Sequence, residues 1–178
     1  MAKLSPAVQK FVLHWGEMGT RWGVNRTVAQ IHALLYVSAK PLNAEEIAEA
    51  LSLARSNVSN SLRELQGWGI IKVVHLLGDR RDHFESLKDV WKMFQIVLDE
   101  RKRREIDPTI TMLQESIAEM GKERVDVYAK RKLQEMFDFF KIGISWYSDV
   151  RRLPAGSLYK LAKLGGKVQE FLSKQSKS

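Results

Sequence analysis

The sequence predicts a mainly α-helical protein with a small β-hairpin wing, in which a winged helix-turn-helix precedes a helical dimerisation region. Hydrophobic residues make up 44% of the 178 residues and charged residues 28%, with 4 prolines and 11 glycines, which favours helices around a real core. Apolar residues recur at helical spacing along most of the chain. Only between Ile70 and Leu87 does the pattern change to short, β-branched runs on either side of a Gly-Asp turn.

Two helices are predicted before residue 40. Ser5 is a good N-cap for the first, and Pro6 suits the first helical position because the missing N–H has no partner there. The second helix is expected from about Thr27 to Ser38, where Lys40-Pro41 ends it.

A helix-turn-helix is predicted next. Asn43 caps a short helix, and Glu46 stands where a capping box needs its second partner. After a tight turn at residues 52–54, a further helix is expected over residues 55–66. Strands over residues 70–77 and 82–87, joined by a turn at 78–81, then form the wing.

The second half of the chain is predicted to be helical. One helix is expected over residues 90–106, and Asp107-Pro108 is read as the N-cap and first turn of the next, which runs to about Tyr128. Further helices are expected past Leu133 to Tyr147 and over residues 158–172. We therefore divide the chain into a first module, 1–88, which contains the winged helix-turn-helix, and a helical region, 89–178; the residue patterns described below predict DNA binding for the first, and dimerisation and an effector role for the second.

The helix over residues 55–66 has two distinct faces. Val58, Leu62 and Leu65 form the buried side. The predicted DNA-binding side consists of Arg55, Ser56, Asn57, Ser59, Asn60 and Arg63. Short hydroxyl and amide side chains let the backbone approach the major groove, where Asn pairs with adenine and Arg with guanine or phosphate. The alternative, a merely solvated face, would favour long Glu and Lys side chains, which are scarce in the first two turns.

The turn at residues 78–81 carries Arg80 and Arg81, which are predicted to enter the minor groove beside the half-site. The alternative is an ordinary hairpin whose arginines are solvated or paired with Asp79 or Asp82. The turn alone does not decide between these interpretations.

The net charge of +8 makes an anionic partner plausible, with nucleic acid first. From Lys40 to Ser86, however, acidic residues are about as frequent as basic ones, and the excess lies in residues 101–104, 130–132, 151–152 and the C-terminal tail. DNA affinity of the module must then come from the placement of a few arginines. The near-neutral charge also leaves open a winged-helix protein-interaction module without specific DNA binding.

These segments resemble the winged-helix regulators of the MarR superfamily, and more closely its GbsR branch. The resemblance rests on residues 41–51, on residues 56–65, on the wing pattern Gly-Asp-Arg-Arg-Asp-His-Phe-Glu at 78–85, and on residues 22–23 and 26–29. It implies a DNA-binding repressor or dual regulator, dimeric through terminal helices, on a pseudo-palindromic operator. Some members of the branch respond to choline in osmoprotectant metabolism. Ala54 departs from the family, which usually has a capping hydroxyl there, so Ser52 or Ser56 is expected to cap the helix instead.

The resemblance and a large supply of aromatic rings together predict a ligand site between the winged module and the helical region. The candidate residues are Trp15, Trp22, Trp91, Trp146 and Tyr147. Rings around a cavity hold a quaternary ammonium such as choline by cation–π attraction. The alternative is that these rings belong to the core, because aromatics at helical spacing usually do.

A homodimer is predicted from the apolar side chains outside the module, which exceed what one helical layer buries by itself. They are Met93, Phe94, Val97, Phe137, Phe139, Phe140, Trp146, Leu158 and Leu161, joined by Phe11 and Trp15 of the first helix.

The same sequence argues against an enzyme. It has no cysteine, and its four histidines show no metal-ligand spacing. Phosphate-binding glycine loops and hydrolase motifs are absent, so no cofactor, metal or catalytic residue is predicted. Without a signal peptide or a long apolar run, we expect a cytoplasmic protein without membrane contact.

Overall fold

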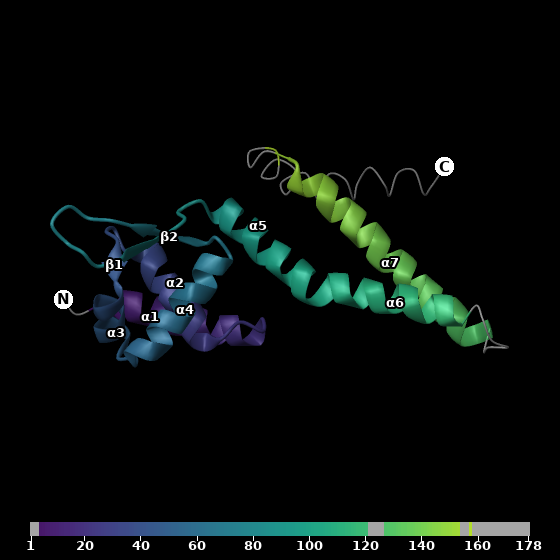
Figure 1. Cartoon of the computed structure of the whole chain (residues 1–178), viewed down its shortest axis with the longest axis horizontal. Coiled ribbons are helices and arrows are strands. Elements are labelled where there is room, and N and C mark those ends of the chain that lie inside the picture. Colours follow the sequence, from purple (N-terminus) through teal and green to yellow (C-terminus); the bar gives the residue numbers. More distant parts are fainter. Residues whose placement is uncertain (1–3, 121–126, 154–156, 158–178) are drawn as a thin grey trace. The chain divides into compact units, whose positions relative to one another are not determined.

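The computed structural model describes residues 4–120, 127–153 and 157. The chain divides into two compact units, residues 1–100 and residues 101–178. The first unit contains the helices α1 (Pro6–Arg21), α2 (Arg26–Val37), α3 (Ala44–Leu51), α4 (Arg55–Gly67) and α5 (Val90–Arg101), and the strands β1 (Leu42–Asn43), β2 (Ile71–Val74) and β3 (His83–Ser86). The second contains the π-helical turn η1 (Lys102–Ile106), α6 (Asp107–Glu119) and α7 (Val127–Arg151) (Figure 1).

The predicted start signals of the first helices are confirmed. The Ser5 hydroxyl accepts a hydrogen bond from the Val8 amide at 3.4 Å. Asn43 and Glu46 form both bonds of the capping box, at 3.0 Å and 2.8 Å. Asn25, which was not predicted as a cap, caps α2 through its side-chain oxygen.

The wing is the outer part of a three-stranded antiparallel sheet of order β1-β3-β2. The hairpin β2–β3 was predicted, although its paired strands are shorter than expected. β1 was not predicted, since two residues are too few to show an alternating pattern. Its Leu42 pairs with Phe84, which also pairs with Val73 of β2, so the central strand is anchored on both sides.

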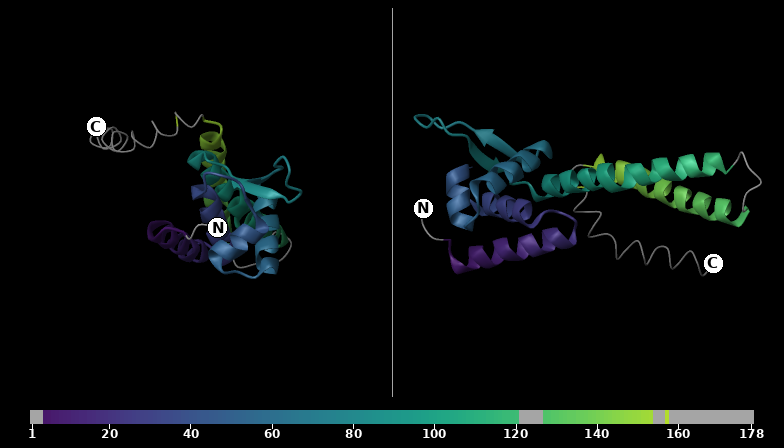
Figure 2. Two further views of the ribbon diagram at one scale, coloured as in Figure 1. Left: turned by 90° about the vertical axis from the view of Figure 1, so that its left-hand side faces the viewer. Right: turned by 60° about the horizontal axis from the view of Figure 1, so that its bottom comes forward.

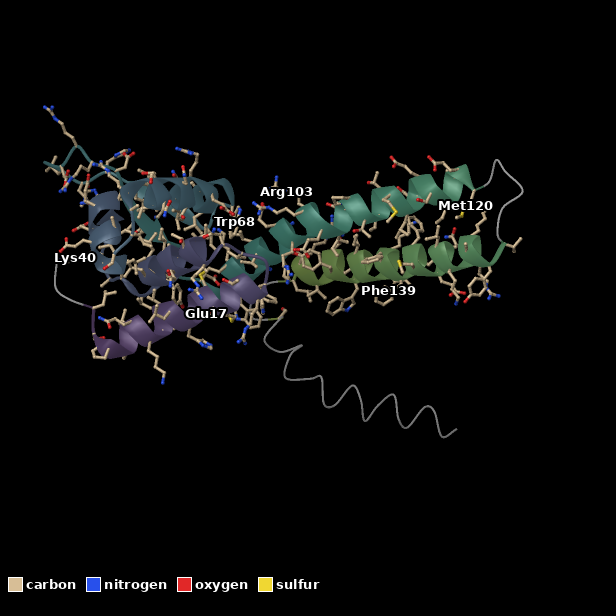
Figure 3. All side chains as sticks on the ribbon, turned by 90° about the horizontal axis from the view of Figure 1, so that it is seen from below. Glu17, Lys40, Trp68, Arg103, Met120 and Phe139 are labelled. Atoms are coloured by element: carbon tan, nitrogen blue, oxygen red, sulfur yellow. The ribbon has the colours of Figure 1, made fainter. Side chains whose placement is uncertain are left out.

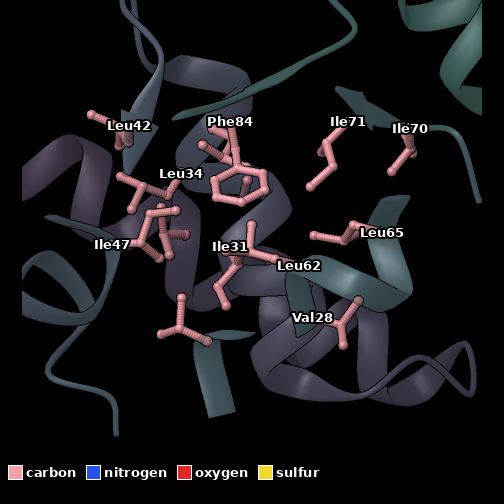
Figure 4. Packing of buried hydrophobic residues seen from close by; sticks show 14 of the residues in the cluster. Val28, Ile31, Leu34, Leu42, Ile47, Leu62, Leu65, Ile70, Ile71 and Phe84 are labelled. Carbon is pink, nitrogen blue, oxygen red and sulfur yellow. The ribbon is translucent and has the colours of Figure 1, made fainter. Parts of the chain in front are cut away.

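The core of the first unit lies between α2, α4 and the sheet. Figure 4 shows Ile31 of α2, Leu62 of α4 and Phe84 of β3 pointing toward one another. Ile31 is 0% exposed and Leu62 2% exposed. Beside this core, α1 packs closely on α2 because Gly19 lies against Ala29, where a Cβ on Gly19 would be only 2.5 Å from the Ala29 Cβ.

Lys88, just beyond β3, closes the C-terminal end of α2. Its Nζ donates to the carbonyl oxygens of Leu35, Tyr36 and Ser38 at 2.9, 2.7 and 2.9 Å. These are carbonyls that a helix end leaves without intrahelical donors, and a cation is favourable there. The contact fixes the end of α2 to the chain that leaves the sheet.

Asp107 is the first residue of α6, yet it is not the predicted N-cap that separates two helices, so that prediction is wrong. Helical backbone runs from Val90 to Glu119 through η1, and Asp107 itself is helical, with φ −59° and ψ −45°. Pro108 has no N–H for the carbonyl of Arg104, and its ring crowds that oxygen. The helix adapts by widening into one π turn before the proline, rather than by ending.

In the second unit, α6 and α7 lie side by side (Figure 2). Among the described residues of this unit, Leu113 of α6 is the one buried side chain, at 1% exposure. The helix expected to run to about Tyr128 ends instead at Glu119. The helix expected over 158–172 lies outside the described residues. No helix within the described ranges is both long enough and apolar enough to cross a membrane.

Candidate DNA-binding surface

The N-terminus of α4 has no side-chain cap. Ala54 occupies the cap position in extended conformation and offers no acceptor to the first amides of the helix. Ser52 instead ends α3 with φ 53°, in the left-handed region, so the expectation that Ser52 or Ser56 caps α4 is wrong. The amide donors at the start of α4 are left to groups outside the helix.

α4 buries one face and exposes the other. Val58, Leu62 and Leu65 are at most 2% exposed and hold the helix against the core. All six side chains that were predicted to contact DNA are exposed: Arg55, Ser56, Asn57, Ser59, Asn60 and Arg63. A row of short polar groups with two arginines can therefore approach a groove without moving the core.

Two of these side chains are already hydrogen-bonded to each other. Arg63 Nη1 donates to Asn60 Oδ1 at 3.2 Å across one helical turn. The bond orients the Asn60 amide. When Asn60 or Arg63 bonds a base edge, this hydrogen bond would be replaced by the one to the base.

A polar hollow of about 260 Å³ lies between α4 and the start of α2. Its lining is Asn25, Thr27, Val28, Asn57, Asn60, Ser61 and Glu64. The face of α4 that carries Asn57 and Asn60 therefore continues onto the amide end of α2, where a helix favours negative charge.

The tip of the wing is held by two successive turns. The Asp79 amide donates to the Leu76 carbonyl at 3.1 Å, and Gly78 between them has φ 84°, which favours glycine. The Asp79 carboxylate then accepts the Arg81 amide at 3.0 Å and the Arg81 Nε at 2.9 Å. Together these bonds give the tip a defined shape.

The two wing arginines have different surroundings. Hydrogen bonds to Asp79 raise the pKa of Arg81, and the same bonds hold the pKa of the Asp79 carboxyl well below its usual range. The exposed Arg80 side chain makes no hydrogen bond or ion pair with any described residue. Without DNA, Arg81 is therefore paired with Asp79 and Arg80 is solvated.

Below the wing, the buried His83 ring lies within 3.0 Å of the Arg81 carbonyl oxygen through Nδ1. Its Nε2 is 3.6 Å from the Asp79 carboxylate. Among the described residues, no group of histidines and carboxylates is arranged to hold a metal ion.

A second hollow, apolar and about 180 Å³ in volume, lies entirely within the first unit. α1, α2, the end of α4 and α5 supply its walls, and its aromatic lining consists of Trp15, Trp22, Trp68 and Phe94, with His32 alongside. For comparison, an engineered cavity of about 150 Å³ holds benzene, so the space suits a small molecule.

The structure brings together only part of the aromatic set named from the sequence. Trp15 and Trp22 line the cavity. Trp91, Trp146 and Tyr147 do not, and the last two lie on α7 in the second unit. Trp68, labelled in Figure 3, was missed. Its signal was present, because it continues the apolar spacing of Leu62 and Leu65 just past the end of α4.

His32 gives this cavity its polar edge. Its Nε2 lies 3.2 Å from the Ser86 hydroxyl. Burial lowers the pKa of His32 to about 4, and the nearby Lys88 charge acts in the same direction. The ring is therefore neutral at physiological pH, and no carboxylate lines the cavity.

The chain is similar to known regulators of transcription. Residues 22–82 match the family model described as MarR family. The chain is 23% identical over 136 residues to the HTH-type transcriptional repressor GbsR of Bacillus subtilis, covering 74% of this chain and 75% of the relative. It is 22% identical over 153 residues to the putative HTH-type transcriptional regulator YvaV of the same organism, covering 84% of this chain and 86% of the relative.

A solved structure, described as a transcriptional regulator, superposes with a TM-score of 0.66. It is 22% identical and the match covers 89% of this chain and 99% of that chain. The superposition confirms the predicted fold class. The prediction that this chain is not an enzyme is also confirmed, because the matched family and relatives are regulators of transcription.

Proposed function

We propose that the protein is a cytoplasmic, homodimeric repressor that binds a pseudo-palindromic operator, since residues 22–82 match the MarR family model and the matched relatives are described as regulators of transcription. The observation that carries this proposal is the face of α4. Its short polar side chains are all exposed, while the opposite face is fixed in the core. Such a helix meets the requirement for reading base edges in a major groove.

Arg80 is the wing side chain best suited to the minor groove. The two turns around Gly78 and Asp79 fix the tip, and Arg80 extends from it without a partner among the described residues. A narrow A·T-rich minor groove has an enhanced negative potential that attracts such a side chain. Arg81, held by Asp79, would supply the second positive charge.

The DNA assignment is tested by anisotropy titrations of an operator duplex and a random duplex. Asn60→Ala and Arg63→Ala should each weaken operator binding by about 1–3 kcal/mol more than random binding, because a base contact is lost. Arg80→Ala should lose affinity mainly for sites with an A·T-rich flank. Lys72→Ala is the control, since Lys72 pairs with Glu85 on the sheet at 2.7 Å. Equal binding of both duplexes by the parent would favour the protein-interaction module instead.

For the dimer, α7 offers an exposed apolar stripe. Met136 is 51%, Phe139 73%, Ile142 71% and Trp146 64% exposed. At about 100° per residue they fall within about 120° of the helix circumference. Phe139 lies on the side of α7 turned away from α6 (Figure 3). This much exposed apolar surface is typical of an interface.

The structure narrows the set of side chains available for that interface. Phe11, Trp15, Met93 and Val97 pack in or against the core of the first unit, which leaves the stripe on α7 as the main candidate. Leu158 and Leu161 lie outside the described residues. Sedimentation should show a dimer at micromolar concentration, and Phe139→Glu should shift it to monomer. Gln134→Glu, on the opposite side of α7, should leave the dimer intact.

We assign the effector to the apolar cavity of the first unit. Tryptophan rings and the absence of lining carboxylates fit a small quaternary ammonium such as choline, held at about 0.5–2 kcal/mol per ring contact. A ligand that contacts both α5 and α1 would favour one spacing of the two recognition helices over others. Only a spacing near 34 Å fits successive half-sites, so DNA affinity would change.

Calorimetric titration with choline and glycine betaine tests the effector. Binding should be weakened at least severalfold by Trp22→Leu, which removes a cavity ring that is 43% exposed and therefore contributes little to the core. Trp91→Leu, the same substitution outside the cavity, should bind like the parent. If neither compound binds the parent at millimolar concentration, the effector assignment is wrong, although DNA binding stands apart from it.

A further inference from the structure

Glu45 of α3 contacts both elements that are proposed to meet DNA. Its Oε1 lies 2.8 Å from Nη2 of Arg55, the first residue of α4. Its Oε2 lies 3.9 Å from Nη1 of Arg81 in the wing. One carboxylate thus links the start of the recognition helix to the wing, although α3 itself presents none of the proposed base-reading side chains.

Three of the four arginines proposed to meet DNA are held by neighbouring side chains when DNA is absent, and Arg80 is the exception within the described part of the chain. Arg55 is held by Glu45, Arg81 by Asp79 and Glu45, and Arg63 by Asn60. A guanidinium has five N–H donors, but a full bidentate contact with a phosphate competes with the carboxylate that already engages some of them. Because these pairs are exposed, they are weak enough to exchange readily.

The charge of the module makes this exchange significant. Residues 40–86 contain six lysines and arginines against seven aspartates and glutamates, so there is no bulk attraction for phosphate. The basic members are Lys40, Arg55, Arg63, Lys72, Arg80 and Arg81, and the acidic members are Glu45, Glu46, Glu49, Glu64, Asp79, Asp82 and Glu85. Non-specific binding depends almost entirely on such electrostatic attraction.

We propose that Glu45 is a positioning residue that holds Arg55 and Arg81 in one arrangement and lowers affinity for random DNA, because each arginine must exchange Glu45 for a phosphate. The inference rests on the proposed function and deepens it. At the operator, Glu45 keeps each guanidinium near the phosphate that it is proposed to contact, so part of the cost of exchange is offset by pre-organisation. On random DNA no base contact offsets it, and the carboxylate favours dissociation.

The test compares Glu45→Gln with Glu85→Gln on operator and random duplexes over a range of salt concentrations. Glu85 is the matched control, because it is also an ion-paired glutamate of the module, but its partner is Lys72. Glu45→Gln should bind random DNA about three- to tenfold more tightly at low salt, with a smaller gain at the operator, so that discrimination falls. The gain should shrink as salt rises. Glu85→Gln should change random binding by less than about twofold.

A second comparison separates arginine exchange from simple repulsion of phosphate. In an Arg55→Ala, Arg81→Ala background, Glu45→Gln should no longer increase random binding. Persistence of the full gain there, or equal gains in Glu45→Gln and Glu85→Gln, would overturn the inference. Glu45→Asp keeps the charge but shortens the reach, and should give an intermediate result. Circular dichroism melts should show the parent's melting temperature for all three single variants.

Failure of the proposed function gives a different result. In that case the parent protein itself does not prefer operator to random duplex. If the parent prefers operator to random duplex and Glu45→Gln binds both duplexes as the parent does, only the role of Glu45 is contradicted.

Discussion

Close packing of α1 on α2 depends on Gly19, and Gly19→Ala tests it. The new Cβ would lie 2.5 Å from the Ala29 Cβ, whereas Cβ contacts below 3.0 Å are essentially never seen. Both atoms are fixed to helical backbone, so no side-chain rotation relieves the clash and α1 has to move away from α2. Overpacking of this kind costs about 1–3 kcal/mol. Alanine restores about 1 kcal/mol through its higher helix propensity.

A Cβ–Cβ contact of 2.5 Å is severe, so we take the upper part of the overpacking range, about 2–3 kcal/mol, and expect a net loss of about 1–2 kcal/mol in the free energy of unfolding. Urea denaturation followed by tryptophan fluorescence measures it. Gly67→Ala, where a Cβ meets nothing within 4 Å, should be neutral or slightly stabilising. Adding Ala29→Gly to Gly19→Ala should recover part of the loss by removing the opposing methyl. A Gly19→Ala variant as stable as the parent would refute the close contact.

Three further perturbations concern single interactions. The folded-state pKa of His32, about 4, lies below the unfolded value of 6.5, so the stability present above pH 6.5 should decline by up to about 3 kcal/mol as the pH falls to 4. Chemical denaturation should show this fall in the free energy of unfolding for the control His75→Gln but not for His32→Gln. Lys88→Met should lower stability by about 1–2 kcal/mol by removing the cation from the end of α2, and should raise the pKa of His32 in an NMR titration. Ala54→Ser should stabilise the protein by about 1 kcal/mol in the same denaturation assay, and no gain would mean that solvent already satisfies the first amides of α4.

Local sequence signals were sufficient to predict helix starts where one residue type suits one backbone position. The capping box at Asn43 and Glu46 and the N-cap at Ser5 each depend on residues three apart, and both form as expected. At Asp107-Pro108 a local signal failed, since a proline is compatible with a helix start and also with a widened turn inside a helix. A helix start forms if the preceding turn is not helical, and a widened turn forms if it is. The two residues Asp107 and Pro108 do not contain that information.

The candidate site was predictable to the extent that it is periodic. The spacing of Val58, Leu62 and Leu65 among short polar residues is enough to define both faces of α4. The apolar spacing of α4 extends to Trp68, but its place in the cavity depends on residues of α1 and α5, which are distant in the sequence. The different surroundings of Arg80 and Arg81 likewise could not be predicted, because they depend on a turn geometry that brings Asp79 into contact with Arg81 alone.

The sequence by itself determined the elements and their polarity, because helix caps, periodic apolar spacing and turn residues act over a few neighbouring positions. It was enough for the fold class, the two faces of α4, the wing hairpin and the family resemblance. Only the tertiary structure decided which side chains meet across the chain: Gly19 with Ala29, the rings around the apolar cavity, and Glu45 with both Arg55 and Arg81. Such contacts depend on the packing of several elements around one core, and no pattern within a single helix or strand specifies them.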